Sequence, residues 1–408
     1  MKEKSLLLNK KSKNITGEIS ICGSKSESNR LLILNSLFDN KISISNLSDS
    51  DDTRVLKEAL NSNAKNINIG HAGTAMRFLT AYYSIIENLE VKLDGSDRMR
   101  QRPIGVLVDA LKALGAEINY LENHGFPPLE IKGKSIIKDH VSLEANISSQ
   151  FITALLLIAP KLTNGLNIEL EGEITSLPYL LMTVELLKKL GIRVEQKGNQ
   201  FIVYPKEEIH PTSIEVESDW SSASYFYSLA AISDSCDLKI SSFRKESLQG
   251  DSALQNIYKE HFGVNTFFEN QRIQLVKNKD FQPKFIELNL NRTPDLAQTI
   301  AVSCAALKTK CKLTGLATLK IKETDRLVAL KNELQKIGAL SKISEDSLEI
   351  IDFIAADNLP KIKTYDDHRM ALSFAPYSLI QSIEIESSEV VNKSYPKFWE
   401  DFARLNYR

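Results

Sequence analysis

The segment GSKSESNR (residues 23–30) combines two cations, Lys25 and Arg30, with three serines, and an apolar helical pattern follows it at once. Backbone N–H groups at the start of a helix lack hydrogen-bond partners and the helix dipole is positive there, so anions bind well at such a place. Lysine and arginine beside these groups favour phosphate or carboxylate. The alternative is a serine-capped helix with solvated charges.

Two further segments combine access to the backbone with positive charge. In GHAGTAMR, Gly73 lies at a helix start, and its lack of a Cβ atom lets a ligand approach the main chain closely. In DGSDRMRQRPIG, three arginines, the last of them Arg102, precede a helix that we expect Pro103 to begin. Arginine pairs with carboxylate or phosphate, so both segments are candidates for anion binding. Tight or solvated turns are the alternatives.

Uncharged hydrogen-bonding groups occur at two other helix starts. Ser148, Ser149 and Gln150 open an almost wholly apolar helix, and Ser176 and Tyr179 follow the next strand. Such groups suit a neutral polyol or a phosphate. Ordinary helix caps are the alternative here too.

Carboxylates that could move protons stand beside cations later in the chain. Asp295, in RTPDLAQTIA, is either an N-terminal helix charge or a general base. In KETDR, Lys322 and Arg326 are four residues apart and are expected to share a helix face, with Glu323 next to Lys322. A surface ladder of ion pairs is the alternative.

The last candidates are Asp367, His368 and Arg369, which open the helix RMALSFAPYSL, and Lys393 in NKSYPKFW. Taken together, the cations, neutral polar groups and two carboxylates suit a small, highly anionic, polyhydroxylated substrate. No metal-ligand set, Walker loop or dinucleotide fingerprint accompanies them in the sequence.

The elements that must position these residues follow a repeat of about 75 residues. An amphipathic helix ends at a glycine and two short alternating strands follow, at Gly115, Gly191, Gly263 and Gly338, with spacings of 76, 72 and 75 residues. Glycine suits the positive φ of a helix C-cap, and the alternating strands predict a hairpin. A fixed period indicates repeated supersecondary units.

A second helix with a polar N-terminus precedes each of these units, at 72–86, 148–159, 219–232 and 293–307. The unit then reads strand–helix–strand–helix–strand–strand, and about six such units fit 408 residues, three in each of two domains. Polar helix starts from both domains could converge on one cleft.

The composition limits the classes of function. A hydrophobic content of 42% and a charged content of 25% are typical of a soluble globular protein. The net charge of −1 gives no general basic field for nucleic acid. The apolar run near residues 151–160 is too short for a membrane span, and the N-terminus shows no signal-peptide pattern. The four cysteines show neither metal-ligand nor disulfide spacing, which predicts a cytoplasmic protein.

The chain closely resembles the 5-enolpyruvylshikimate-3-phosphate synthase family of enolpyruvyltransferases. The segments that carry this resemblance run in the family's order from residue 23 to residue 399: GSKSESNR, DSDDTR, AGTAMR, RMRQRPIG, SSQFITALLLIAP, SLPY, RTPD, KETDR, DDHRMA and KSYPKFW.

The resemblance implies transfer of the enolpyruvyl group of phosphoenolpyruvate to the 5-hydroxyl of shikimate 3-phosphate, through a tetrahedral intermediate and with release of phosphate. This reaction belongs to the shikimate pathway, which leads to chorismate and the aromatic amino acids, and its enzyme is the target of glyphosate. The implied fold is α/β, with two globular domains of three βαβαββ-type units each, helices inside and sheets outside. One domain would cover 23–216 and the other 1–22 with 217–408, with the active site in the cleft between them. No cofactor or metal is implied, and the partners are the two substrates of a cytoplasmic monomer.

The resemblance also assigns site residues. Shikimate 3-phosphate would be bound by Lys25, Ser26, Arg30, Ser148, Ser149, Gln150, Ser176, Asp295 and Lys322. Phosphoenolpyruvate would be bound by Lys25, Gly73 through its backbone, Arg102, Gln150, Arg326, Arg369 and Lys393. The catalytic residues would be Asp295, Glu323 and Lys25: Asp295 takes the hydroxyl proton, and Glu323, or a lysine, protonates the methylene carbon.

Four positions depart from the family pattern: Cys22, His71, Phe78 and Thr318 replace the usual Pro, Asn, Pro and Asn. Phe78 follows AGTAMR on the helix that positions Gly73, so the sequence leaves glyphosate sensitivity open.

Other functions fit less well. UDP-N-acetylglucosamine enolpyruvyltransferases share the fold and the donor but usually carry a reactive cysteine in the loop DGSDRMRQRP, which has none here. A catalytically silent binding protein for phosphorylated metabolites would not need Asp295 and Glu323. The near-neutral charge disfavours an RNA-end-modifying relative.

Overall fold

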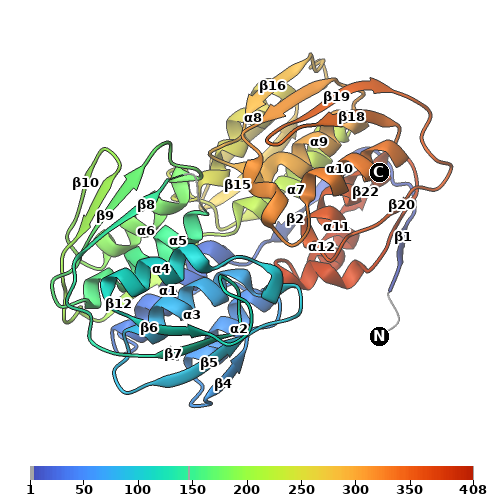
Figure 1. Cartoon of the computed structure of the whole chain (residues 1–408). Coiled ribbons are helices and arrows are strands. Elements are labelled where there is room, and N and C mark those ends of the chain that lie inside the picture. Colours follow the sequence, from blue (N-terminus) through green and yellow to red (C-terminus); the bar gives the residue numbers. More distant parts are fainter. Residues whose placement is uncertain (1–3, 146–147, 408) are drawn as a thin grey trace. The chain divides into compact units, whose positions relative to one another are not determined.

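A computed structural model describes residues 4–145 and 148–407. Residues 1–3 and 408, which fall within the expected domain segments, lie outside the described residues. Contacts divide the chain into two compact units (Figure 1). We call Ser24–Val216 the inserted unit, and Met1–Gly23 with Glu217–Arg408 the two-segment unit.

The inserted unit alternates helices with short strands. Its helices are α1 (Lys25–Leu37), α2 (Asp51–Leu60), α3 (Gly73–Ser84), η1 (Met99–Gln101), α4 (Gly105–Leu114), α5 (Ser149–Ile158), η2 (Ala159–Lys161) and α6 (Leu177–Lys189). Its strands are β3 (Ile42–Ser45), β4 (Asn66–Asn68), β5 (Glu90–Asp94), β6 (Glu117–Tyr120), β7 (Leu129–Lys132), β8 (His140–Glu144), β9 (Leu166–Glu171), β10 (Val194–Lys197), β11 (Gln200–Val203) and β12 (Thr212–Glu215). Within the described residues they form three sheets, ordered β4-β5-β7-β6, β10-β11-β9-β8 and β12-β3.

The two-segment unit follows the same plan. Its helices are α7 (Trp220–Ile232), η3 (Gly250–Ala253), α8 (Leu254–Phe262), η4 (Pro294–Leu296), α9 (Ala297–Ala306), η5 (Ala317–Ile321), α10 (Arg326–Lys336), α11 (His368–Phe374), η6 (Ala375–Leu379), η7 (Ser388–Lys393) and α12 (Phe398–Arg404). Its strands are β1 (Leu6–Leu8), β2 (Asn14–Ser20), β13 (Ser235–Ser241), β14 (Val264–Glu269), β15 (Arg272–Lys277), β16 (Ile286–Asn289), β17 (Cys311–Thr314), β18 (Ala339–Ile343), β19 (Leu348–Phe353), β20 (Lys361–Ile362), β21 (Ile383–Ile385) and β22 (Asn406–Tyr407). Its described sheets are ordered β1-β21-β20, β14-β15-β13-β2-β22 and β16-β17-β19-β18.

The repeat expected from the sequence is confirmed. Each of its four glycines has a positive φ, of 113°, 72°, 67° and 83° in chain order, directly after a helix or one residue later. The strands that follow each glycine pair antiparallel, as β6 with β7, β10 with β11, β14 with β15 and β18 with β19. Glycine caps and alternating strands are local signals, so the sequence alone located them.

Helices form the centre of each unit and sheets form its outer layers (Figure 1). In the two-segment unit α7, α9 and α11 pack on one another, and nearly every residue of these helices is buried. In the inserted unit α1, α3 and α5 pack together in the same way. The strands instead alternate buried and exposed residues, as in β2 and β9, because one sheet face meets the helices and the other meets solvent. This arrangement confirms the expected fold class.

Two expected helix starts were wrong. Pro103 does not begin a helix: α4 starts at Gly105, after the short helix η1. The helix expected at 293–307 begins as the 3-10 turn η4 and becomes α-helical only at Ala297. Across the described residues, no helix is both long enough and apolar enough to cross a membrane.

Candidate active site

Most of the predicted site residues lie at the N-termini of the central helices. In the inserted unit, Lys25 begins α1, Gly73 begins α3, and Ser148 caps α5. In the two-segment unit, Asp295 lies in η4, directly before α9, and Asp367 caps α11. The ends of these helices that carry unpaired N–H groups therefore also carry the candidate residues, as the sequence predicts.

Lys25 lies beside an acid to which the sequence reasoning gave no role. Its Nζ is 3.5 Å from Oδ2 of Asp52, a buried residue in the first turn of α2. The segment DSDDTR carries part of the family resemblance but does not by itself indicate which of its acids meets Lys25. The neighbouring Ser24 caps α1, accepting a hydrogen bond from the Glu27 N–H at 3.4 Å.

Arg30 is buried inside the inserted unit. Its Nε donates to Thr183 Oγ1 (2.8 Å), its Nη1 to the Ser26 carbonyl (2.7 Å), and its Nη2 to Thr153 Oγ1 (3.3 Å) and the Tyr179 carbonyl (3.1 Å). Burial lowers the pKa of Arg30 to about 10, although Tyr179 and Glu27 oppose this effect. These four bonds hold the guanidinium through neutral acceptors, so its charge still attracts an anion.

Gly73 and Arg102 lie against each other. A Cβ atom placed on Gly73 would stand 2.5 Å from Nη1 of Arg102, which is nearly buried. The Gly73 carbonyl accepts a hydrogen bond from Nη1 of Arg77 at 3.1 Å. Gly73 therefore provides the room in which the Arg102 guanidinium lies.

Of the uncharged candidate residues in the inserted unit, some cap a helix and others do not. Ser148 is a cap, accepting a hydrogen bond from the Gln150 N–H at 3.4 Å, while the Gln150 side chain reaches Thr74 Oγ1 at 3.5 Å. Ser149 is the first residue of α5. Ser176 precedes α6 but makes no capping bond, and its φ of 57° is uncommon for serine. Such a backbone strain is typical of functional sites.

Asp295 is surrounded by three cations of the two-segment unit. Its Oδ2 is 3.0 Å from Nη2 of Arg369, and its Oδ1 is 3.0 Å from Nη1 of Arg326 and 3.7 Å from Nζ of Lys322. Burial alone would raise the pKa of Asp295, but Arg369, Lys322 and Arg326 together hold it well below its usual range. The carboxylate is therefore ionised and firmly held.

Arg326 links three carboxylates and is only 2% exposed. Its Nε and Nη2 donate to the two oxygens of Asp367 (2.6 and 3.3 Å), and its Nη1 and Nη2 donate to Asp295 (3.0 Å) and Glu323 (2.8 Å). Burial alone would lower the pKa of Arg326, but these carboxylates together raise it.

Glu323 lies between Arg326 and Lys393. Its Oε1 accepts a hydrogen bond from Nζ of Lys393 at 2.6 Å, so Lys393, a lone basic residue in its own segment, belongs to this cluster. The expected shared helix face of Lys322 and Arg326 was wrong, because α10 begins only at Arg326 and the backbone at Lys322 is not helical. Both cations nevertheless reach Asp295, and burial lowers the pKa of Lys322.

Ser221 and Asp251 were missed by the sequence reasoning. The Ser221 hydroxyl at the start of α7 donates to Asp251 Oδ2 and lies 3.4 Å from Nη2 of Arg369. Asp251 is 2% exposed. The sequence did show the polar start of α7, in DWSSAS, but none of its residues was assigned to a substrate. The three serines and the aspartate of this segment do not reveal that Ser221 meets Arg369.

The stability of the protein should respond to the ionisation of Asp251. Burial raises the pKa of Asp251 to about 6, with Asp295 adding to this effect and Arg369 opposing it. The folded state therefore holds this proton more tightly than the unfolded state, so the free energy of unfolding should fall as the pH rises from about 4 to about 6. An Asp251→Asn variant lacks this titration. As the pH rises from 4 to 8, the free energy of unfolding of this variant should therefore increase by up to about 3 kcal/mol relative to that of the wild type. Denaturant unfolding at several pH values measures this, and parallel pH curves would contradict it.

Three of the positions that depart from the family pattern have well-defined surroundings. His71 Nδ1 is 3.0 Å from the Ser96 hydroxyl. The Phe78 ring is buried, with the Arg30 guanidinium 5.8 Å from its centre. The Thr318 hydroxyl is buried, and no hydrogen-bond partner for it occurs among the described residues.

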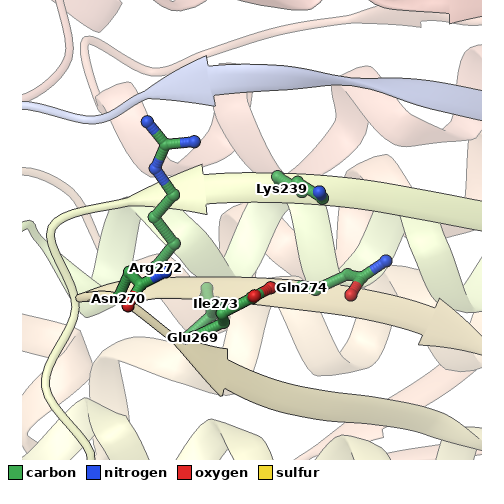
Figure 2. A pocket seen from close by; sticks show the side chains of 6 residues that line it. All are labelled: Lys239, Glu269, Asn270, Arg272, Ile273 and Gln274. Atoms are coloured by element: carbon green, nitrogen blue, oxygen red, sulfur yellow. The ribbon is translucent and has the colours of Figure 1, made fainter.

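A hollow on the two-segment unit shares no lining residue with these clusters (Figure 2). It lies over β13 and β15 and is lined by Lys239, Glu269, Asn270, Arg272, Ile273 and Gln274. Predicted site residues are absent from this lining. In the described part of the chain, no group of three or more His, Cys, Asp or Glu residues could hold a metal ion.

Comparisons with known proteins identify the family of this chain. The family model of EPSP synthase (3-phosphoshikimate 1-carboxyvinyltransferase) matches residues 9–64 and 57–402. A 3-phosphoshikimate 1-carboxyvinyltransferase of Bacteroides fragilis is 42% identical over 400 residues, with 96% of each chain covered. One from Actinobacillus pleuropneumoniae serotype 5b is 35% identical over 432 residues, with 97% of each covered.

Solved structures show the same fold. An EPSP synthase from Acinetobacter baumannii superposes with a TM-score of 0.78 at 20% identity, over 99% of this chain and 98% of that one. The enolpyruvyl transferase NikO from Streptomyces tendae superposes with a TM-score of 0.75 at 12% identity, over 100% of both chains. The family model and the sequence relatives cover nearly the whole chain. The chain therefore belongs to the EPSP synthase (3-phosphoshikimate 1-carboxyvinyltransferase) family.

Proposed function

We propose that this protein transfers the carboxyvinyl group of phosphoenolpyruvate to the 5-hydroxyl of shikimate 3-phosphate and releases phosphate. The observation that carries the proposal is the carboxylate of Asp295 held by Lys322, Arg326 and Arg369, with Glu323 next to it in the same ion-pair cluster. This reaction needs an acid–base pair beside cations that orient two phosphates and two carboxylates.

The acceptor substrate is proposed to bind mainly through the inserted unit. Lys25, Arg30 and the polar groups of Ser26, Ser148, Ser149, Gln150 and Ser176 would hold shikimate 3-phosphate, with Lys322 and Asp295 contributed by the other unit. The donor would be held by Lys25, the Gly73 backbone, Arg102, Gln150, Arg326, Arg369 and Lys393. We also propose that the protein is a cytoplasmic monomer.

The ion pairs of Asp295 suggest how it becomes a base. A carboxylate whose pKa is held low by cations is a weak proton acceptor. The phosphate and carboxylate groups of the substrates would compete for Lys322, Arg326 and Arg369, and each cation drawn away raises the pKa of Asp295. Asp295 would then accept the proton of the 5-hydroxyl only when the substrates are in place.

The proposed reaction balances as an addition followed by an elimination. The substrate oxygen, losing its proton to Asp295, forms a bond to C2 of phosphoenolpyruvate while C3 gains a proton and becomes a methyl group. The tetrahedral adduct then loses a methyl proton, and its C–O bond to phosphate breaks as the double bond re-forms. Glu323 is the proposed proton donor to C3. The lowered pKa of Lys322 leaves this lysine as the alternative.

The direct test is phosphate release from phosphoenolpyruvate with shikimate 3-phosphate as acceptor. UDP-N-acetylglucosamine serves as the control acceptor and should give no release. In D₂O, the vinyl methylene of the product should gain deuterium, because the transient methyl group returns one of its three hydrogens. Release with the control acceptor alone would favour the other enolpyruvyltransferase activity.

Gly73→Ala should impair donor binding by displacing Arg102. The added methyl group would overlap the flexible end of the Arg102 side chain, so the fold should tolerate it while the guanidinium moves. We expect the KM for phosphoenolpyruvate to rise about 10-fold or more, the effect of losing a charged hydrogen bond, and inhibition by the longer analogue glyphosate to weaken further.

An Arg102→Ala background provides the control for this prediction. Without the guanidinium there is nothing for the methyl group to displace, so Gly73→Ala should add little to the loss in that background. Additive effects of the two substitutions would count against the contact between Gly73 and Arg102 as the cause.

A further inference from the structure

The turn before α11 has an unusual backbone. The Asp367 N–H donates to the Thr364 carbonyl at 2.9 Å, and the two residues between them, Tyr365 and Asp366, have φ values of 54° and 55°. Two consecutive positive φ values occur in type I′ turns, which favour glycine, asparagine and aspartate. Tyrosine is poorly suited to this conformation, because its Cβ crowds the backbone there. The surrounding structure must therefore stabilise Tyr365 in it.

This turn leads directly into the ion-pair cluster. Asp367, its last residue, caps α11 by accepting a hydrogen bond from the Arg369 N–H at 2.9 Å, and it also binds Nε of Arg326 at 2.6 Å. Arg369 in turn binds Asp295. The orientation of the turn thus sets the directions of Asp367 and Arg369.

A buried acid on α10 holds the turn. Glu333 is 0% exposed, and its Oε1 accepts a hydrogen bond from the Tyr365 hydroxyl at 2.8 Å. Its Oε2 accepts from the Lys363 N–H at 2.9 Å and from Nζ of Lys336 at 2.7 Å. Burial, together with the bond to Glu333, raises the pKa of Tyr365 to about 12, so the phenol keeps the proton that it donates.

Two points on one side of α10 therefore fix the turn. Arg326, which binds Asp367, and Glu333, which binds Tyr365, are seven residues apart, which is two helical turns and places them on the same face. A single contact would leave the segment free to pivot about the pair of Arg326 and Asp367. The second contact fixes its direction.

We propose that Glu333 and Tyr365 are positioning residues, which hold the turn 364–367 so that Asp367 and Arg369 face Arg326 and Asp295. The proposal rests on the proposed function for its catalytic consequence. If the turn alone mattered, asparagine or glycine at position 365 would form it with less strain. What tyrosine adds is the hydroxyl that reaches Glu333.

Two variants separate positioning from stability. Tyr365→Phe keeps the strain and loses the hydroxyl, whereas Tyr365→Asn relieves the strain and also loses the hydroxyl. We expect the thermal midpoint of Tyr365→Asn to be equal to or higher than that of Tyr365→Phe. Both variants should lose about 10- to 100-fold in kcat/KM for phosphoenolpyruvate, as expected for a misplaced binding group. Shikimate 3-phosphate binding should change little.

Tyr204→Phe is a matched control in the inserted unit. The Tyr204 hydroxyl donates to Glu195 at 3.0 Å, so this variant also removes one hydrogen bond between a tyrosine and a glutamate. It should keep wild-type kcat/KM. The positioning role would be overturned if Tyr365→Asn kept wild-type kcat/KM. It would also be overturned if the losses in kcat/KM simply paralleled the decreases in thermal midpoint.

Hydrogen exchange tests the same proposal without turnover. In Tyr365→Phe, which keeps the strain and loses the hydroxyl, the amides of Asp367 and Arg369, bonded to Thr364 and to Asp367, should exchange faster than in the wild type. If the wild-type protein releases no phosphate, the proposed function is wrong. The exchange measurement still tests the positioning role, because it does not depend on activity. Unchanged exchange of these two amides in Tyr365→Phe would overturn the inference itself.

Discussion

Asp295→Asn is expected to lower turnover by about 10²- to 10⁴-fold, the range typical of losing a general acid or base. Asparagine keeps the shape of aspartate but cannot accept the proton of the attacking hydroxyl. It also no longer attracts Lys322, Arg326 and Arg369, so these cations should bind the substrate anions at least as well as before. We therefore expect kcat to fall far more than shikimate 3-phosphate binding weakens.

Asp325→Asn provides a matched control for this prediction. Asp325 stands in the same KETDR segment and caps α10, accepting hydrogen bonds from the Leu327 and Val328 N–H groups at 3.1 and 3.2 Å. Asparagine caps helices about as well as aspartate, so turnover should stay within a few-fold of the wild type. Single-turnover phosphate release and calorimetric binding of shikimate 3-phosphate measure the two effects. Near-normal turnover in Asp295→Asn would reduce this residue to a helix-terminal charge.

The low pKa of Asp295 also has a consequence for stability. A carboxyl whose pKa is depressed in the folded state adds stability above its unfolded pKa of about 4, and this contribution is lost as the pH falls further. The stability cost of Asp295→Asn should therefore be larger at pH 7 than at pH 3. This trend is opposite to the one expected for Asp251.

The repeat and the central helix starts were predictable because their signals are local. A glycine after an amphipathic helix, followed by alternating strands, specifies a cap and a hairpin within about twenty residues. The same holds for Ser148 and Asp367, which cap helices whose first turns the sequence shows. The candidate residues at these positions could thus be named in advance.

The pairings between these residues could not be predicted, because they join distant segments. Lys25 meets Asp52, Arg326 meets Asp367, and Ser221 meets Asp251, and the partners are 27 to 41 positions apart in the sequence. Polar residue types show that a cluster is present but not which charges neutralise each other.

The wrong expectation for KETDR has a local cause, and the positive φ of Tyr365 could not be predicted at all. The four-residue spacing of KETDR matched a helix that starts only at Arg326, where Asp325 caps it. Tyr365 gave no signal of a positive φ, because tyrosine rarely adopts one. Tertiary contacts, here with Glu333, overrode the local preference.

The second large effect should come from Arg326. Its guanidinium is almost wholly buried and binds three carboxylates, of which Asp367 is fully buried. Arg326→Met would leave these charges without their shared cation, and breaking a buried ion pair in this way costs about 3–5 kcal/mol. The thermal midpoint should fall by roughly 6–20 °C, since each kcal/mol is worth about 2–4 °C in a unit of this size. Donor binding should weaken as well.

Arg404→Met is the surface control, because Arg404 is 71% exposed and its partners Glu400 and Asp401 are 3.8 and 3.7 Å away. Exposed pairs contribute about 0–1 kcal/mol, so this variant should unfold near the wild-type temperature. Arg326→Lys keeps the charge but loses the planar guanidinium that binds both oxygens of Asp367. Its thermal midpoint should therefore lie between those of Arg326→Met and Arg404→Met.

A double-mutant cycle with Asp367→Asn identifies the source of the loss. Asparagine at 367 still accepts the Arg369 N–H that the aspartate accepts at 2.9 Å, so the cap of α11 is kept while the buried charge is removed. If the uncompensated carboxylate of Asp367 is what destabilises Arg326→Met, the double variant should be more stable than the sum of the single losses predicts. The expected coupling is about 1–3 kcal/mol, as for other contacting pairs. Additive losses would mean that Arg326 stabilises the unit through Asp295 and Glu323 instead. The hydrogen bonds of the turn would then be enough to stabilise the charge of Asp367.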